Sequence, residues 1–159
     1  HSSLSSGIRC RKPGRVDRMT LWILDTDHLS LIQRQHPTAI QRLASMNPDN
    51  VAITTVITAE EQLRGRLNTI RQASNAAQSR KLLEAYSLFR ETLEDLKSLS
   101  ILGFSPIAHV QFAELKQQNL RIGTQDLKIA SIALSLNAIV VTRNQRDFGQ
   151  VPDIQLEDW

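Results

Sequence analysis

Short apolar segments that alternate with helix-forming segments constrain the fold of this chain most strongly. Residues 21–24, Leu-Trp-Ile-Leu, are wholly apolar, and short, largely apolar runs occupy 51–53, 101–104, 138–142 and 154–156. A strand without polar positions is typical of a sheet covered on both faces, as parallel sheets are. Because helical segments separate these runs, the 159-residue chain is predicted to form one α/β domain. We expect a central, mainly parallel sheet of about 4–5 strands flanked by helices.

The helices between these strands are marked by capping residues and by proline. Thr26 or Asp27 can cap a helix that ends near residue 34, and this would leave Asp25 free. Pro37 suits the first turn of a second helix, which ends near residue 46 and precedes a loop at 47–50. Further helices are expected at 56–71, 78–99, 106–119 and 125–136.

The predicted helix at 78–99 has the clearest amphipathic pattern. Its apolar residues recur in steps of four and three, which places them in one seam: Leu82, Tyr86, Phe89, Leu93 and Leu96. Such a seam packs either against the preceding helix, in an intradomain hairpin, or against a second molecule in a dimer or partner interface. The pattern alone does not choose between these two arrangements.

Residues 1–18 differ in character from the rest of the chain. The segment is polar, basic and aperiodic, and a strand-like run begins at Met19. We expect residues 1–18 to be a disordered tag or vector remnant, with Met19 as the natural start and 19–159 as the folded domain. A native, disordered basic arm is the alternative interpretation.

This division changes the meaning of the net charge. The whole chain has 19 Lys and Arg residues against 16 Asp and Glu residues, a net of +3. Five of these bases and one acid lie in residues 1–18, so the remainder holds 14 bases and 15 acids, a net of −1. The basic charge of the chain therefore gives no support for nucleic-acid binding by the domain itself.

Cysteine content and hydropathy narrow the classes of protein further. The one cysteine, Cys10, lies in residues 1–18, so residues 19–159 can form neither a disulfide nor a thiolate metal site. A reducing, cytoplasmic location is expected. No apolar run approaches the roughly 20 residues that a membrane-spanning helix needs, and no membrane association is expected.

Four acidic residues occupy positions from which their carboxylates can converge. Asp25 ends the first strand, Glu61 lies in the helix after the second, Asp126 opens an apolar helix, and Asp147 follows the fourth strand. In α/β folds, ligands bind beyond the carboxyl ends of the strands. Carboxylates gathered without His or Cys favour a hard cation such as Mg²⁺ or Mn²⁺. Each acid also has a structural explanation, as a helix cap, a solvated face, a first-turn charge or a loop residue.

Further polar residues accompany these acids. Thr142 and Asn144 follow the fourth strand and place a hydroxyl and an amide near Asp147, and Asp27 adds a carboxylate of unknown role. Three basic residues flank the expected site: Arg64, Arg143 and Arg146. They can contact phosphates, and solvated surface or ion pairs with the acids are the alternative. None of the four histidines is needed for chemistry at a carboxylate site.

Four short motifs surround the acids in order along the chain. They are Asp25-Thr26-Asp27, Thr58-x-x-Glu61-x-x-x-Gly65, Asp126-x-x-Ile129-Ala130 and Thr142-Arg143-Asn144-x-x-Asp147-Phe148. By their order and spacing, these motifs resemble those of PIN-domain ribonucleases, most closely the VapC-type toxins of bacterial toxin–antitoxin pairs. The resemblance extends from about Leu21 to the end of the chain.

The resemblance assigns the second acid of the pattern to one of two adjacent residues. Glu60 and Glu61 point about 100° apart on a helix, so only one can face a given site. Glu61 alone stands three residues after Thr58 and four before Gly65, as the family pattern requires. The resemblance therefore implies Glu61.

The other three acids follow from the same pattern. Asp25 corresponds to the first acid and Asp126 to the third. The fourth is Asp147 by preference, because many PIN domains have an acid where this chain has Asn144 and others use the Asp before Phe. The remaining polar groups are implied as supporting residues: Thr142, Asn144, and Asp27, which stands where the family often has Asn.

The resemblance further implies a Mg²⁺- or Mn²⁺-dependent ribonuclease. The four acids would hold the metal directly or through water, and the metal would lower the pKa of the attacking water and neutralise charge on the phosphate. Hydrolysis in line would leave a 5′-phosphate and a 3′-hydroxyl. The implied partners are an RNA substrate, a cognate antitoxin that sends a basic group into the acidic site, and a second copy in a homodimer.

Two other functions compete with this interpretation. A haloacid-dehalogenase-type phosphatase also has Asp-x-Asp after its first strand, and Asp25 would then be the nucleophile. His28-Leu29 does not match that family at the following positions, and no later Lys motif is evident. The other rival is a non-catalytic PIN-like module, in which the acids are structural or bind a basic partner.

Overall fold

Five parallel strands form one sheet in the order β3-β2-β1-β4-β5. The computed structural model describes residues 20–46, 51–75 and 79–159. The expectations for residues 1–18 and for the loop at 47–50 concern residues outside these ranges. The strands are β1 (Leu21–Leu24), β2 (Val51–Thr55), β3 (Ile101–Leu102), β4 (Ile139–Val141) and β5 (Gln155–Glu157). The predicted α/β class with a parallel sheet is confirmed.

Seven helices connect or cover these strands in the described part of the chain. They are α1 (Thr26–Gln33), α2 (Pro37–Ala44), α3 (Val56–Asn75), α4 (Ser79–Lys97), α5 (Pro106–Lys116), α6 (Thr124–Leu136) and α7 (Gln145–Phe148). The short α7 is not predicted by periodicity, because four residues are too few to show one. The third strand is shorter than the predicted 101–104, since Ser105 already caps α5 by accepting the Ala108 N–H at 3.1 Å.

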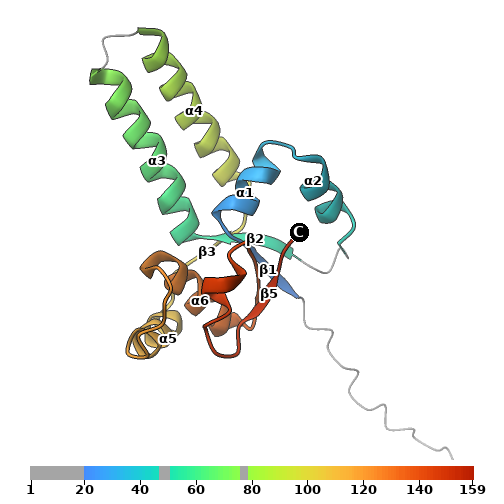
Figure 1. Ribbon diagram of the computed structural model, residues 1–159. Helices are drawn as coiled ribbons and strands as arrows, with labels where there is room; N and C mark the ends of the chain where they lie inside the picture. The colour runs from blue at the N-terminus through green and yellow to red at the C-terminus, as the bar shows by residue number, and fades with distance from the viewer. Residues whose placement is uncertain (1–19, 47–50, 76–78) are drawn as a thin grey trace, which may run out of the picture.

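The sheet separates two apolar clusters. On one face, Ile23 and Val140 pack with α6, whose residues from Ile129 to Ala133 are all buried, and with the fully buried Phe148. On the other face, Leu24 and Val141 pack with Leu29 of α1. Figure 1 shows this arrangement, with α5 and α6 on one side of the sheet and α1 and α2 on the other. No described helix is long and apolar enough to span a bilayer.

Helices α3 and α4 form an antiparallel hairpin that projects away from the sheet (Figure 1). Of the two arrangements that the sequence left open, the structure has the intradomain hairpin, but the predicted seam is wrong in part. Tyr86 and Leu93 are 53% and 44% exposed, whereas Ala85 and Thr92 are buried. Leu96 of the predicted row is buried as expected. At the two exposed positions the small neighbours Ala85 and Thr92 take the place of Tyr86 and Leu93, and small side chains let the helices approach closely.

Candidate functional site

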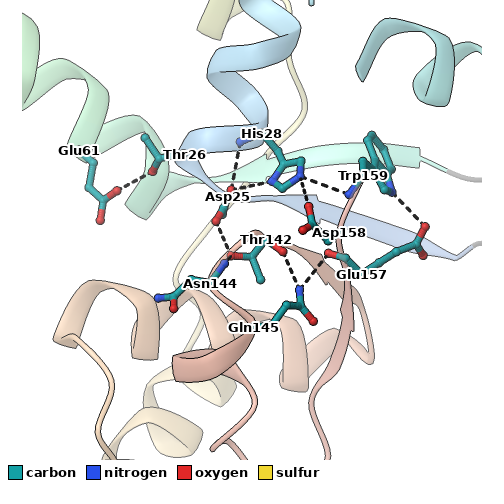
Figure 2. Close-up of polar contacts among 10 residues, drawn as sticks. All are labelled: Asp25, Thr26, His28, Glu61, Thr142, Asn144, Gln145, Glu157, Asp158 and Trp159. Carbon is teal, nitrogen blue, oxygen red and sulfur yellow. Dashed lines mark hydrogen bonds and ion pairs between the residues drawn. The ribbon is translucent and has the colours of Figure 1, made fainter. Parts of the chain in front are cut away.

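The candidate site lies at the carboxyl edge of the parallel sheet. Asp25 follows β1, Thr142 follows β4, and α3, which contains Glu61, begins directly after β2. Asp126 lies in the first turn of α6. The three strands are adjacent, so their carboxyl ends bring these segments together, as Figure 2 shows for the first three.

Asp25 is the most strongly held carboxylate of the site. Its Oδ1 accepts the backbone N–H of His28 at 3.1 Å, which makes Asp25 the N-cap of α1. The prediction that Thr26 or Asp27 caps this helix is therefore wrong, because Asp25 has the extended backbone of a cap, at φ −73° and ψ 176°. Its Oδ2 accepts the hydroxyl of Thr142 at 2.6 Å.

These contacts fix the ionisation of Asp25. Burial acts to raise the pKa of Asp25, which is only 8% exposed. Hydrogen bonds from the His28 ring, the Thr142 hydroxyl and the His28 backbone, together with the charge of His28, outweigh burial and hold the pKa below its usual value. Asp25 is thus a carboxylate at neutral pH.

A chain of hydrogen bonds continues from Asp25 to two further acids. The Thr142 hydroxyl accepts the backbone N–H of Asn144 at 3.0 Å. The side-chain amide of Asn144 in turn donates to Asp147 Oδ2 at 3.1 Å and, more weakly, to Asp126 Oδ2 at 3.5 Å. Asn144 thereby lies between Asp126 and Asp147, and it also caps α7 through the Asp147 N–H.

Asp126 has the least favourable environment for a negative charge. Burial, followed by the negative charges of Glu61 and Asp25, raises the pKa of Asp126 to about 6, and Asp147 adds to this effect. The hydrogen bond from Asn144 lowers the pKa only in part. The other three predicted acids, although far apart from it in sequence, therefore all act electrostatically on Asp126.

The two adjacent glutamates of α3 have different partners. Glu61 Oε2 accepts the hydroxyl of Thr26 at 2.6 Å, next to Asp25 (Figure 2). Glu60 instead pairs with Arg64 at 3.0 Å and accepts the side-chain amide of Gln125 at 2.9 Å. Glu61 is thus the glutamate tied to the first acidic motif. Thr26, which sequence patterns present only as a capping candidate, orients it.

The four candidate carboxylates are chemically suited to bind a divalent cation. The four carboxylates supply only oxygen ligands, the kind that Mg²⁺ and Mn²⁺ prefer. Among the residues that the structure describes, no three His, Cys, Asp or Glu side chains already lie close enough to enclose an ion. The crowding that raises the pKa of Asp126 is the repulsion that a bound cation would relieve.

The remaining predicted residues lie at the margin of the site. Asp27 is exposed, and no side-chain hydrogen bond of it is found within the described ranges. Arg64 forms an exposed ion pair with Glu60, which was the structural alternative for it. Arg143 and Arg146 are exposed at the turn before α7 and in α7 itself.

His28 is the site residue that the sequence pattern does not reveal. Its side chain is completely buried, with Nδ1 at 3.2 Å from Asp25 Oδ1 and Nε2 at 3.1 Å from Asp158 Oδ1. Burial acts to lower the pKa of His28, but the hydrogen bond and charge of Asp25 and the charge of Asp158 raise it overall. The i, i+3 spacing from Asp25 was the available signal, but Asp158 is far away in sequence.

Comparison with known proteins places this geometry in a family. The family model of the PIN domain matches residues 22–154. The chain is 29% identical to ribonuclease VapC1 of Haemophilus influenzae (strain R2866) over 140 residues, 87% of this chain and 98% of that protein. It is 26% identical to the tRNA(fMet)-specific endonuclease VapC of Salmonella typhimurium (strain LT2) over 145 residues, 89% and 99% of the two chains.

Solved structures agree with these matches. The structure of VapBC2 from Rickettsia felis, bound to a DNA fragment from its promoter, has a TM-score of 0.62 and 26% identity, and the match covers 88% of this chain and 99% of that one. The resemblance to VapC-type proteins is thereby confirmed. Because the family model spans most of the described residues, the chain belongs to the PIN-domain family.

Proposed function

We propose that this protein is a divalent-metal-dependent ribonuclease and the toxin of a toxin–antitoxin pair. The observation that carries the proposal is the convergence of carboxylates from separate segments: Asn144 joins Asp126 to Asp147, and Asp25 and Glu61 lie near enough for their charges to act on Asp126. The names of the relatives, ribonuclease VapC1 and tRNA(fMet)-specific endonuclease VapC, support RNA as the substrate class.

In this proposal four carboxylates would hold the metal, directly or through water: Asp25, Glu61, Asp126 and Asp147. A metal held there would supply an activated water and would stabilise charge on the phosphate. The chain's own contribution is orientation. Thr142 and His28 fix Asp25, Thr26 fixes Glu61, and the Asn144 amide lies between the last two acids. Carboxylates held in this way lose little freedom when the metal and the substrate bind.

Phosphate groups of the RNA would meet basic residues around the site. A surface hollow of about 640 Å³ begins at Glu61 and continues along α3 past Arg64 and Asn68 to Arg71. Arg64, Arg143 and Arg146 remain the proposed phosphate contacts, and Arg71 extends this row away from the acids. Contacts of this kind position the strand and do not by themselves select a base sequence.

The proposed partner is a cognate antitoxin. The related Rickettsia felis protein was solved as a VapBC2 complex, which supports a protein partner for this chain. A basic side chain from the partner would form charge-assisted hydrogen bonds with the crowded carboxylates and lessen their repulsion. A homodimer is proposed on family resemblance.

The proposed reaction predicts that Asp126→Asn abolishes RNA cleavage. Removing this carboxylate should lower the rate by about 100-fold or more, the scale on which one electrostatic stabiliser of a transition state matters. The measurement is cleavage of a 5′-labelled RNA mixture with Mn²⁺ or Mg²⁺ by protein free of antitoxin. Cleavage by the wild type should stop when EDTA is added.

Asp153→Asn is the matched control for this assay. Asp153 is exposed and lies among residues far from the acids, so the same change of charge should leave cleavage intact. RNA left whole by the wild type with Mn²⁺ present would favour the non-catalytic module. A covalent aspartyl-phosphate trapped on Asp25 would instead revive the phosphatase.

A further inference from the structure

We infer that His28 and Asp158 are positioning residues, which hold the Asp25 carboxylate for metal binding. The three side chains form a relay, Asp25–His28–Asp158, that connects the end of β1 with the C-terminal segment, residues 157–159. The inference rests on the proposed function, because it assigns Asp25 a role in that reaction. It adds a connection between the first acid and residues 157–159 that the four acidic motifs do not contain.

The relay is continuous and largely buried. His28 Nδ1 lies 3.2 Å from Asp25 Oδ1, and His28 Nε2 lies 3.1 Å from Asp158 Oδ1 and 3.4 Å from the backbone nitrogen of Trp159. The ring is completely buried, so no water competes for its two nitrogens. Figure 2 shows the imidazole standing between Asp25 and Asp158.

The chemistry of the partners fixes the protonation of one ring nitrogen. An ionised carboxylate is an acceptor only, so the nitrogen that faces Asp25 must carry a proton. His28 Nδ1 therefore donates to Asp25. In metal sites, residues that hydrogen-bond to a metal ligand fix the orientation of that ligand and raise the affinity of the site for the metal. His28, itself oriented by Asp158, has this relation to Asp25.

The other oxygen of Asp25 leads to the same C-terminal segment. Asp25 Oδ2 accepts the Thr142 hydroxyl at 2.6 Å, and the Thr142 backbone N–H donates to the Glu157 carbonyl at 2.8 Å. Both oxygens of Asp25 are thus tied, through one intermediate residue each, to consecutive residues of the chain. Two such connections restrain both the position and the rotation of the carboxylate.

Packing holds the C-terminal segment in place. β5 pairs with β4, and the Trp159 ring lies 6.1 Å from the Trp22 ring and 5.9 Å from the Arg42 guanidinium. Arg42 also forms an ion pair with Glu157, to which the Trp159 indole N–H donates at 3.1 Å. Asp158 therefore contacts His28 from a segment whose neighbouring residues, Glu157 and Trp159, are both held by packing and hydrogen bonds.

Asp158 allows a test that does not disturb the core. Its side chain is 49% exposed, so replacing it should change the melting temperature little, whereas replacing the buried His28 can unfold the protein. We expect Asp158→Ala to weaken Mn²⁺ binding and to slow RNA cleavage by about 10-fold each. Asp158→Asn keeps a side chain that can hydrogen-bond to Nε2 as donor or acceptor, and this variant should remain close to the wild type.

Glu114→Ala is the control, because it removes an exposed carboxylate that lies beside Asn137, at the opposite end of α6 from Asp126. It should match the wild type in both measurements. If the wild type cleaves RNA and Asp158→Ala cleaves equally fast with the same Mn²⁺ affinity, the positioning role is overturned. If the wild type does not cleave RNA at all, the proposed function itself fails.

A second readout does not depend on activity. The ring nitrogens of His28 can be observed by long-range ¹H–¹⁵N correlation in the metal-free protein. The relay predicts that Nδ1 carries a proton in the wild type and in Asp158→Asn, and that the Nε2 resonance shifts in Asp158→Ala. A neutral ring with its proton only on Nε2 would contradict the relay.

Discussion

Asp126→Asn is expected to raise the free energy of unfolding of the metal-free protein by about 1–3 kcal/mol at pH 7.5. In the folded chain the pKa of Asp126 is raised from 3.8 to about 6 by burial and by the charges of Glu61 and Asp25. An ionised Asp126 therefore destabilises the native state at neutral pH. Asparagine removes that charge and keeps an oxygen for the Asn144 amide.

The pH dependence gives this prediction its sign. Because the pKa of Asp126 is higher in the folded chain than in the unfolded chain, protonation of Asp126 stabilises the fold. This stabilisation is complete below pH 3.8, the pKa in the unfolded chain, and is lost as the pH rises through about 6. The gain from Asp126→Asn should be full above pH 6 and should shrink between pH 6 and pH 4. Urea unfolding in EDTA at several pH values measures it, with Asp153→Asn as control. A variant less stable than the wild type at pH 7.5 would contradict this account of Asp126.

Asp25→Asn is expected to have the opposite effect on stability. Its carboxylate accepts hydrogen bonds from the His28 backbone, the His28 ring and Thr142 while it is buried. Asparagine can still cap α1, but it loses the charge that faces His28 and brings an N–H₂ group among donors. The cost is about 1–3 kcal/mol, the scale of hydrogen bonds to a charged group.

The two variants should also differ in the pH range over which their stability departs from that of the wild type. Because the native pKa of Asp25 is lowered, its stabilising effect is present above 3.8 and is lost only as the pH falls through the lower native value. The deficit of Asp25→Asn should therefore persist from pH 7.5 to pH 5. Asp27→Asn, in the first turn of the same helix, should cost at most about 0.3–1 kcal/mol. Equal stability of Asp25→Asn and the wild type at pH 7.5 would refute this prediction.

Together, the two substitutions separate stability from function. Both variants should lose RNA cleavage, yet one should unfold more easily and the other less easily than the wild type. Opposite effects of the same chemical change exclude general unfolding as the cause of lost activity. They would also show that the electrostatic repulsion in the site is concentrated on Asp126, where a bound cation would relieve it.

Much of the fold is predictable from sequence because its signals are local. Four consecutive apolar residues at 21–24 specify a strand covered on both faces, and the apolar helix at 125–136 specifies a covering layer. The α4 seam was only partly predictable. Ala85 and Thr92 form the contact because the neighbouring helix approaches them, which residue size alone does not reveal.

The candidate acids could be proposed from sequence because Asp25 follows a strand and Asp126 opens a helix, whereas Glu61, inside α3, was chosen over Glu60 only by the family resemblance. The supporting contacts could not be proposed in this way, since they depend on distant pairs such as Thr26 with Glu61 and His28 with Asp158. The cap of α1 was assigned to the wrong residue because three consecutive polar residues can all cap a helix. Only the backbone conformation at Asp25 decides among them.

The central claim is that the carboxylates around Asp126 bind a divalent cation, and calorimetric titration of the antitoxin-free protein with Mn²⁺ tests it most directly. At pH 6, in buffers of different ionisation enthalpy, binding should release about half a proton per Mn²⁺, because Asp126 is then half protonated. At pH 8 the release should be close to zero. Mn²⁺ that fails to bind, or that binds equally well to Asp126→Asn, would contradict the claim.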